Sequence, residues 1–274
     1  MGSPAKTSSL TGLVQPDSAD DLLKLLLRDR VGASNLSSAV ESGILDDLRE
    51  EFARNELAGA DLLSLWRMLS LVVAKSAFSA LTSERLHLLN LACAHCEEAP
   101  LLRAFFGQFG PPVRLYGVDI RDREIDTARR RYELTEKVFS KLGVPRLRSE
   151  SAEDEAVFLA DDARNLVGYG QIPGEFHVIF LRHQNLWHDR EIWQRIFEFA
   201  LSRLKPDGLL VITSYFDREH LLATQLLQIL GAELAFTARN PDSRELDYPG
   251  KSIDRHVAAF RRREFVSAAG ISVE

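Results

Sequence analysis

With 274 residues, of which 45% are hydrophobic and 27% charged, the chain is long enough and apolar enough to build one large folded core. Its formal net charge of −6 argues against a nucleic-acid-binding protein that works through a broad basic face. No stretch approaches the roughly 18 consecutive apolar residues that a membrane span needs. The N-terminus lacks an apolar signal segment, and the two cysteines suit a reducing compartment, so we predict a cytoplasmic protein.

The first third of the chain has helical character. Residues 1–16 are polar and contain serine and proline, which predicts a disordered tail. Ser18 precedes two acids and is the predicted N-cap of the first helix. Because apolar residues then recur every three or four positions, we expect a helical cap over residues 17–83. Its predicted helices cover residues 18–30, 34–55 and 59–81.

The remainder, residues 84–274, alternates short apolar runs with helical stretches. This alternation is typical of an α/β protein with a parallel sheet covered on both faces. The last two apolar runs are joined by a loop with proline and glycine, which predicts a C-terminal antiparallel hairpin. We therefore predict a Rossmann-like, doubly wound, mostly parallel sheet. Its predicted strands cover residues 85–92, 113–120, 156–162, 176–182, 208–216, 232–241 and 254–265.

The first predicted strand leads into Cys93-Ala94-His95-Cys96, which has three interpretations. Two cysteines can supply half of a zinc site, but the sequence offers no second pair of ligands with suitable spacing. A CxxC pair after a strand also suits a thioredoxin-like redox site, although that fold is much smaller than this chain. The third interpretation is a nucleotide-binding turn between a strand and a helix.

Small side chains and a following helix favour the nucleotide turn. The strand ends at Asn90, and Ala92, Ala94 and Cys96 stand where a loop of the G-x-G-x-G type would carry glycines. Small residues let a ligand approach the backbone, and the N–H groups at the start of a helix are offered to it. Glu98 lies at the start of that helix.

Acidic residues end the next two predicted strands. A carboxylate at Asp119 can accept hydrogen bonds from both hydroxyls of a ribose, and Ile120 can pack on an adenine ring. Asp162 can accept from the adenine amino group, while a backbone N–H near Ala163 meets the ring. The three loops together predict an adenosine-containing cofactor at the carboxyl edge of the sheet.

Over residues 86–262 this order of motifs resembles the class I S-adenosylmethionine-dependent methyltransferases. Locally it is most similar to chemotaxis-receptor methyltransferases, whose loop of the type A-C-S-x-G-E-E-P compares with residues 92–100 and whose fourth strand, F-D-x-I-F-x-R-N, compares with residues 176–183. The stretch LKPDGLLVI at 204–212 is similar to a motif common to the superfamily. The chain departs from the family at Cys96, where a glycine is usual, at Asn90, where an acid is usual, and at His177, where an aspartate is usual.

The resemblance implies S-adenosylmethionine as cofactor, S-adenosylhomocysteine as product, and a contact between Glu98 and the amino acid end of the cofactor. No metal ligand is predicted. The residues that the loops and the resemblance together indicate for cofactor binding are Asn90, Ala92, Cys93, Ala94, Cys96, Glu98, Asp119, Ile120, Asp162, Ala163 and Leu181.

The acceptor side is predicted past the fourth and fifth strands. His183 and His188 can act as a base or orient the acceptor, and Trp187 can stack on it; alternatively, His188 only starts the next helix. Tyr215 is similarly placed. Arg244, Lys251, Arg255 and His256 can hold an anionic acceptor or lie in a solvated loop, and the N-terminal helices are expected to roof the site.

We predict methyl transfer to oxygen or nitrogen of a small molecule, because neither a basic groove nor interleaved aromatic residues mark a nucleic-acid path. One alternative is a methyltransferase that acts on protein side chains or carboxyl groups. Another is a non-catalytic relative that binds the cofactor, which the missing glycines allow.

Overall fold

The computed structural model describes residues 13–32, 36–41, 43, 45–46, 49–50, 59–76, 78, 85–141, 156–164, 166 and 172–263. Most of the predicted tail, half of the predicted helix over 34–55 and the end of the last predicted strand lie outside the described residues. None of the helices described is long and apolar enough to cross a membrane.

Seven strands form one sheet in the order β3-β2-β1-β4-β5-β7-β6. The first five run parallel, and β7 is antiparallel to both β5 and β6. The predicted Rossmann-like sheet with a C-terminal antiparallel hairpin is therefore confirmed. Strand order reverses between β1 and β4, where ligands bind in sheets of this kind. The strands are β1 (Leu86–Leu91), β2 (Val113–Asp119), β3 (Ala156–Ala160), β4 (Phe176–Arg182), β5 (Leu204–Ser214), β6 (Ala232–Arg239) and β7 (His256–Arg262).

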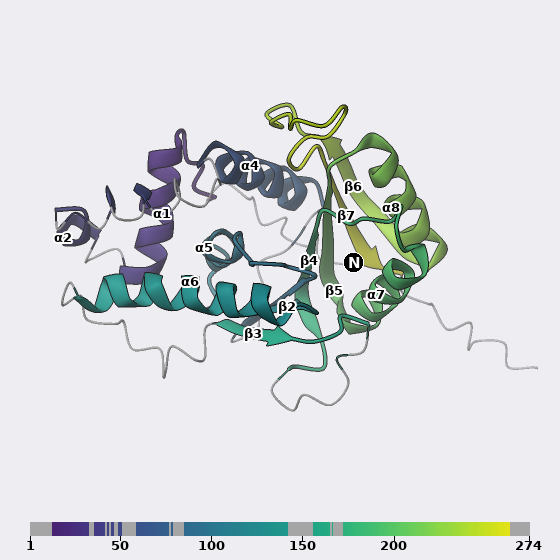
Figure 1. Ribbon diagram of the computed structural model, residues 1–274, viewed down its shortest axis with the longest axis horizontal. Helices are drawn as coiled ribbons and strands as arrows, with labels where there is room; N and C mark the ends of the chain where they lie inside the picture. Colours follow the sequence, from purple (N-terminus) through teal and green to yellow (C-terminus); the bar gives the residue numbers. More distant parts are fainter. Residues whose placement is uncertain are drawn as a thin grey trace, which may run out of the picture.

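Helices cover both faces of the sheet (Figure 1). One hydrophobic cluster joins one face to α1, α4, α5 and the first two turns of α6, and a second cluster joins the other face to α7 and α8. Alternate residues of a strand enter opposite clusters, as Leu88 and Leu89 of β1 do. The helices are α1 (Ala19–Val31), α2 (Leu36–Glu41), α4 (Gly59–Lys75), α5 (Ala99–Gly107), α6 (Asp122–Lys141), α7 (Arg190–Arg203) and α8 (Asp217–Ile229).

The expected roof is not the packing seen for α1 and α4, the two longer N-terminal helices that the structure describes, which lie against one face of the sheet. Helix α4 contacts β6 and β7, and α1 contacts α4 and α5, so both extend one face of the core. Apolar side chains on α4 gain more from burial against the sheet than from covering a polar edge. The predicted tail also ends earlier than expected, because Val14 accepts a hydrogen bond from Trp66 Nε1 at 3.2 Å and donates one to Gln108 at 2.8 Å.

The predicted N-cap of the first helix is confirmed, and an aspartate caps α7. Ser18 caps α1 and accepts from the backbone N–H of Asp21, and Asp189 caps α7 and accepts from that of Ile192. The fifth strand begins earlier than predicted, since β5 starts at Leu204 directly after α7. A register shift between Phe176 and Val178 of β4 accommodates the extra residues.

Candidate active site

The loop after β1 holds three non-glycine residues in the left-handed region. Ala92, Ala94 and Cys96 have φ values of 52°, 48° and 51°. These are the positions where the sequence suggested replaced glycines, so the loop keeps a glycine-like backbone without glycine. L-residues pay roughly 1–2 kcal/mol each for this conformation. Such strain is retained where surrounding contacts impose it, which is common at ligand sites.

Cys96 is accommodated by a glycine in the neighbouring strand. A Cβ added to Gly117 of β2 would lie 2.7 Å from Cys96 Sγ. The thiol is buried and also receives a hydrogen bond from Asn90 Nδ2 at 3.1 Å. The Cys96 side chain is thus directed into the protein, and the absent glycine at this position does not place a bulky group on the ligand side.

The geometry argues against the redox interpretation of the two cysteines. Both thiols are free and buried, and burial raises the pKa of Cys93 and raises that of Cys96 well above its usual range. A redox pair needs an accessible thiolate. Among the residues that the structure describes, no three His, Cys, Asp or Glu side chains are grouped as metal ligands.

Asp119, the last residue of β2, forms a hydrogen bond with the loop after β1. Its Oδ2 accepts from the backbone N–H of Ala94 at 2.8 Å, and its Oδ1 accepts from the backbone N–H and the Nε of Arg121, both at 3.0 Å. The carboxylate is 4% exposed, whereas the adjacent Ile120 is 66% exposed. The loop and the Asp119 carboxylate are therefore in contact, and Ile120 is exposed next to them.

The end of β3 is arranged in the same way. The carboxylate of Asp162 accepts from Arg164 Nε at 2.8 Å, and this hydrogen bond lowers the pKa of Asp162. Asp162 is half-buried, and Ala163 is buried in the second hydrophobic cluster. Arg121 thus pairs with Asp119, and Arg164 pairs with Asp162. Either carboxylate can accept a hydrogen bond from a nucleoside only if its arginine stays bound beside the ligand or moves away.

A buried chain of polar groups connects the loop with β4. Asn90 Nδ2 donates to Glu98 Oε1 at 2.5 Å, and Arg182 Nη1 donates to Glu98 Oε2 at 3.4 Å. Arg182 also donates to Asp254, from Nε at 3.0 Å and from Nη2 at 2.6 Å. The two acids are 3% and 1% exposed, and the arginine's charge lowers the pKa of Asp254 despite its burial. Asn90 Oδ1 is buried without a hydrogen-bond partner, an opening for a polar ligand group.

His183 continues this chain at the end of β4. Its Nε2 lies 2.9 Å from Asp254 Oδ1, and its ring stacks on Tyr215 with a centroid distance of 3.6 Å. Burial lowers the pKa of His183 and raises that of Tyr215. Lys251 Nζ lies 4.4 Å from the centroid of the Tyr215 ring. Two of the three predicted catalytic residues are therefore in contact.

Other predicted site residues lie apart from this chain. Leu181 is fully buried in the cluster beneath α7, so its side chain packs in the core and cannot line a ligand site. His188 is exposed in the turn before the N-cap Asp189, which matches the alternative that it only starts the helix. Trp187 is 41% exposed, and the guanidinium carbon of Arg218 lies over its ring, 4.9 Å from the ring centroid.

Three of the four cations considered for an anionic acceptor are engaged within the protein. Arg244 pairs with Asp61 at 2.6 Å, while Arg255 and His256 both pair with Asp217, at 2.7 Å and 2.6 Å. Only Lys251 of this group lies beside the predicted catalytic residues.

Sequence reasoning missed the importance of Arg182 and Asp254. Arg182 ends an apolar strand, and a buried position for an arginine implies a paired acid. Asp254, which lies 72 positions later, carries no comparable signal in the sequence. Its φ of 46° belongs to the left-handed region that aspartate tolerates better than most residues.

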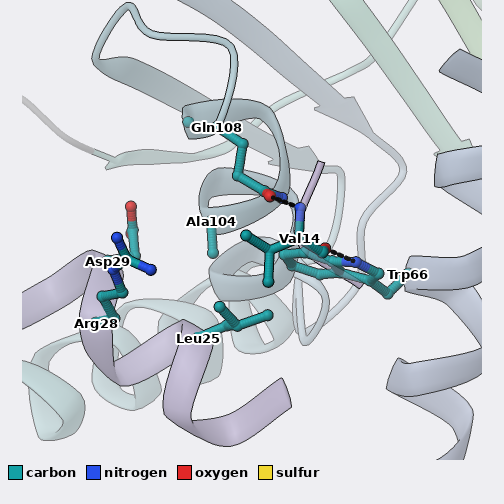
Figure 2. Close-up of a pocket in the computed structure, with 8 residues that line it drawn as sticks. Val14, Leu25, Arg28, Asp29, Trp66, Ala104 and Gln108 are labelled. Atoms are coloured by element: carbon teal, nitrogen blue, oxygen red, sulfur yellow. Dashed lines mark hydrogen bonds between the residues drawn. The ribbon is translucent and has the colours of Figure 1, made fainter. Parts of the chain in front are cut away.

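A cavity of about 490 Å³ lies elsewhere, between α1, α4 and α5 (Figure 2). Val14 forms one side, held by its hydrogen bonds to Trp66 and Gln108, and Arg28 and Asp29 form the opposite side. Because it lies at the far end of α5 from the loop, we do not assign the acceptor to it. Its lining residues are Val14, Leu25, Arg28, Asp29, Trp66, Ala104, Gly107 and Gln108.

No family model matches the chain, and no curated protein matches its sequence. Solved structures with a similar fold include the N-methyltransferase NodS from Bradyrhizobium japonicum, at 17% identity and a TM-score of 0.45 over 72% of this chain and 93% of that chain. A TehB-like S-adenosylmethionine-dependent methyltransferase from Corynebacterium glutamicum matches at 14% identity and 0.45, over 82% and 99%. An S-adenosylmethionine-dependent methyltransferase from Clostridium acetobutylicum matches at 9% and 0.47, over 81% and 98%. These values describe a likeness of general fold and leave the acceptor open.

Proposed function

We propose that this protein is an S-adenosylmethionine-dependent methyltransferase that acts on oxygen or nitrogen of a small molecule. One observation carries the proposal: Ala92, Ala94 and Cys96 keep the backbone of a glycine loop at the point where strand order reverses. An adenosine ligand needs this close backbone approach. A turn that binds no ligand has no need for three residues in a strained backbone conformation, so the strain favours a ligand-binding role.

The residues around the loop fit the cofactor. Asp119 would hold the ribose and Ile120 would pack on the adenine, since the first is a carboxylate below the loop and the second an exposed apolar side chain. Asn90 and Glu98 would meet the amino acid end, where Asn90 Oδ1 has no partner. When bound, the cofactor supplies a methyl group already activated by a sulfonium.

On the acceptor side, His183 and Tyr215 are the groups that we assign to orientation and proton removal. A neutral imidazole is a competent base at neutral pH, and burial favours the neutral form of His183. Lys251 beside Tyr215 adds one positive charge, which favours an acceptor with an acidic or anionic group. The net charge of −6 supports a small molecule over a nucleic acid.

The test is calorimetry with S-adenosylmethionine and S-adenosylhomocysteine. Replacing Asp119 by Asn keeps an acceptor for the Ala94 N–H but removes the charge, so we predict that the binding free energy falls by about 2 kcal/mol. Asp126→Asn, which neutralises an exposed acid on α6, is the matched control and should bind like the wild type.

Absence of binding to the wild-type protein at millimolar concentrations would refute the proposal. Tight binding of both compounds without turnover on any acceptor in a broad screen of phenols, amines and acids would favour the non-catalytic relative instead.

A further inference from the structure

The cavity of about 490 Å³ between α1, α4 and α5 takes no part in the proposed function (Figure 2). Its volume is within the range of small-molecule sites, which is roughly 300–1,000 Å³. The cavity lies beside Gly107, the last residue of α5, whereas the loop after β1 leads into the first turn of that helix. The cavity and the candidate active site therefore lie at opposite ends of α5.

The segment before α1 forms an apolar side of the cavity. The backbone N–H of Val14 donates to Gln108 Oε1 at 2.8 Å, and the Val14 carbonyl accepts from Trp66 Nε1 at 3.2 Å. The Val14 side chain points into the cavity (Figure 2) and is 42% exposed. Because α4 and the end of α5 hold both backbone groups, this side chain cannot withdraw, and a ligand that covers it gains from burial.

The opposite side of the cavity carries one cation and one carboxylate, Arg28 and Asp29 (Figure 2). Arg103 fixes Asp29, since its Nε donates to Asp29 Oδ2 at 3.0 Å and its Nη2 lies 3.0 Å from the same oxygen. Within the described part of the chain, Asp29 Oδ1 and the Arg28 guanidinium form no hydrogen bond or ion pair. A Cβ at Gly107 would lie 3.4 Å from Oδ1, so the glycine keeps the space beside this oxygen open.

The two charges determine the class of ligand. A simple carboxylic acid that binds Arg28 meets the carboxylate of the adjacent Asp29, and a simple amine that binds Asp29 meets the guanidinium; like charges this close repel. A molecule with both an ammonium and a carboxylate forms charge-assisted hydrogen bonds with both side chains. The partial negative charge at the C-terminal end of α5 also favours an ammonium beside Gly107.

We propose that this cavity binds a free α-amino acid with an apolar side chain. Its carboxylate pairs with Arg28, its ammonium pairs with Asp29 Oδ1, and its side chain covers Val14 and Leu25. An α-amino acid suits two neighbouring residues because its two charged groups share one carbon. The inference goes beyond the proposed function and does not depend on it, since no lining residue of the cavity is among those assigned to S-adenosylmethionine.

Trp66 reports on the cavity, because its Nε1–H donates to the Val14 carbonyl. The indole N–H signals of the three tryptophans are recorded in ¹H–¹⁵N spectra of the full-length protein, and Trp187→Phe and Trp193→Phe assign the other two. We expect L-phenylalanine and L-leucine at millimolar concentration to shift the Trp66 signal saturably and to leave the other two signals in place. No shift of the Trp66 signal with either amino acid would overturn the inference.

Two analogues test whether both charges are recognised. 3-Phenylpropionate lacks the ammonium of L-phenylalanine, and phenethylamine lacks its carboxylate. Each analogue loses one charge-assisted pair and meets one like charge, so we expect dissociation constants at least about tenfold higher than that of L-phenylalanine. An analogue that binds as tightly as L-phenylalanine would contradict the assignment of an amino acid.

Arg28→Gln tests the partner of the carboxylate. The side chain is exposed, so the variant should fold, and we expect its affinity for L-phenylalanine to fall by about tenfold while that for phenethylamine does not fall. Arg190→Gln, which neutralises an exposed arginine at the start of α7 on the other face of the sheet, is the matched control and should bind like the wild type. Equal affinities of Arg28→Gln and the wild type for L-phenylalanine would refute the proposal. These titrations contain no S-adenosylmethionine, so their outcome is independent of the calorimetry that tests the proposed function.

Discussion

Three residues of the loop after β1, Ala92, Ala94 and Cys96, adopt a backbone that glycine would adopt without strain. In the sequence alone these residues look like lost glycines, which would favour a relative that has lost its catalytic activity. Their φ values show that the conformation persists. Cys96 explains why one substitution is tolerated, because Gly117 leaves the space that the thiol occupies.

Ala94→Gly should therefore stabilise the protein. Glycine removes the left-handed strain of roughly 1–2 kcal/mol and costs about 0.5–1 kcal/mol in chain entropy, so we expect a gain of up to about 1.5 kcal/mol in the free energy of unfolding. Urea denaturation measures it. Ala104→Gly in the interior of α5 is the control and should destabilise by about 1 kcal/mol or more. A loss at Ala94 as large as that at Ala104 would contradict the strain argument.

Among the elements, the start of α8 carries an unusual acid. Glu219 accepts from the backbone N–H groups of Tyr215 and Phe216 at 2.9 Å and 3.3 Å, which fixes the turn that presents Tyr215 to His183. The residue is 2% exposed, and burial raises its pKa from 4.5 to about 7. The folded state therefore binds a proton more tightly here than the unfolded chain does.

Glu219→Gln should reveal this linkage. Between pH 4.5 and 7 the folded protein holds a proton at Glu219 that the unfolded chain has lost, so this group's contribution to stability falls as pH rises. The variant cannot ionise, and its stability relative to wild type should increase by up to about 3 kcal/mol from pH 4.5 to pH 8. Urea denaturation at both pH values tests this, with the exposed Glu191→Gln of α7 as control; a difference that is independent of pH would refute it.

At the scale of the whole molecule, the N-terminal helix α4 binds the loop between β6 and β7, which lies far from it in the sequence. Asp61, which is 3% exposed, accepts from Arg244 Nε and Nη2 at 2.9 Å and 2.6 Å, and Ser64 accepts from Asn240 Nδ2 at 2.8 Å. Both partners belong to the β6–β7 loop that carries Asp254. Figure 1 shows α4 lying next to this loop.

Asp61→Asn should loosen the β6–β7 loop. The substitution removes the charge that holds Arg244, so we predict faster backbone amide exchange over residues 244–254, by about tenfold, while the strands stay protected. Hydrogen–deuterium exchange with peptide resolution measures this. Asp242→Asn breaks the exposed pair with Arg67, which is worth little, and should leave the exchange nearly unchanged. Equal effects of the two variants would show that Asp61 has no special role.

Local patterns in the sequence were sufficient for the fold. Alternation of apolar runs with helical stretches predicts the parallel sheet, because burial on two faces demands continuous apolar strands. The Ser18 cap follows from side-chain chemistry alone. The sequence also predicts that the loop, Asp119 and His183 lie at one edge of the sheet, because each lies at or just past the end of a strand and the carboxyl ends of parallel strands share one edge; their roles in binding stay predictions.

Tertiary structure decided the rest, because it depends on contacts between distant positions. The pairing of Arg182 with Asp254 and the place of Asp61 beneath Arg244 connect residues 72 and 183 positions apart. Leu181 lies near the end of the strand that His183 and His188 follow, yet Leu181 is buried in the core and His188 is exposed. A side chain's direction depends on strand pleat and loop path, and only the folded chain fixes which of these neighbours meets Asp254.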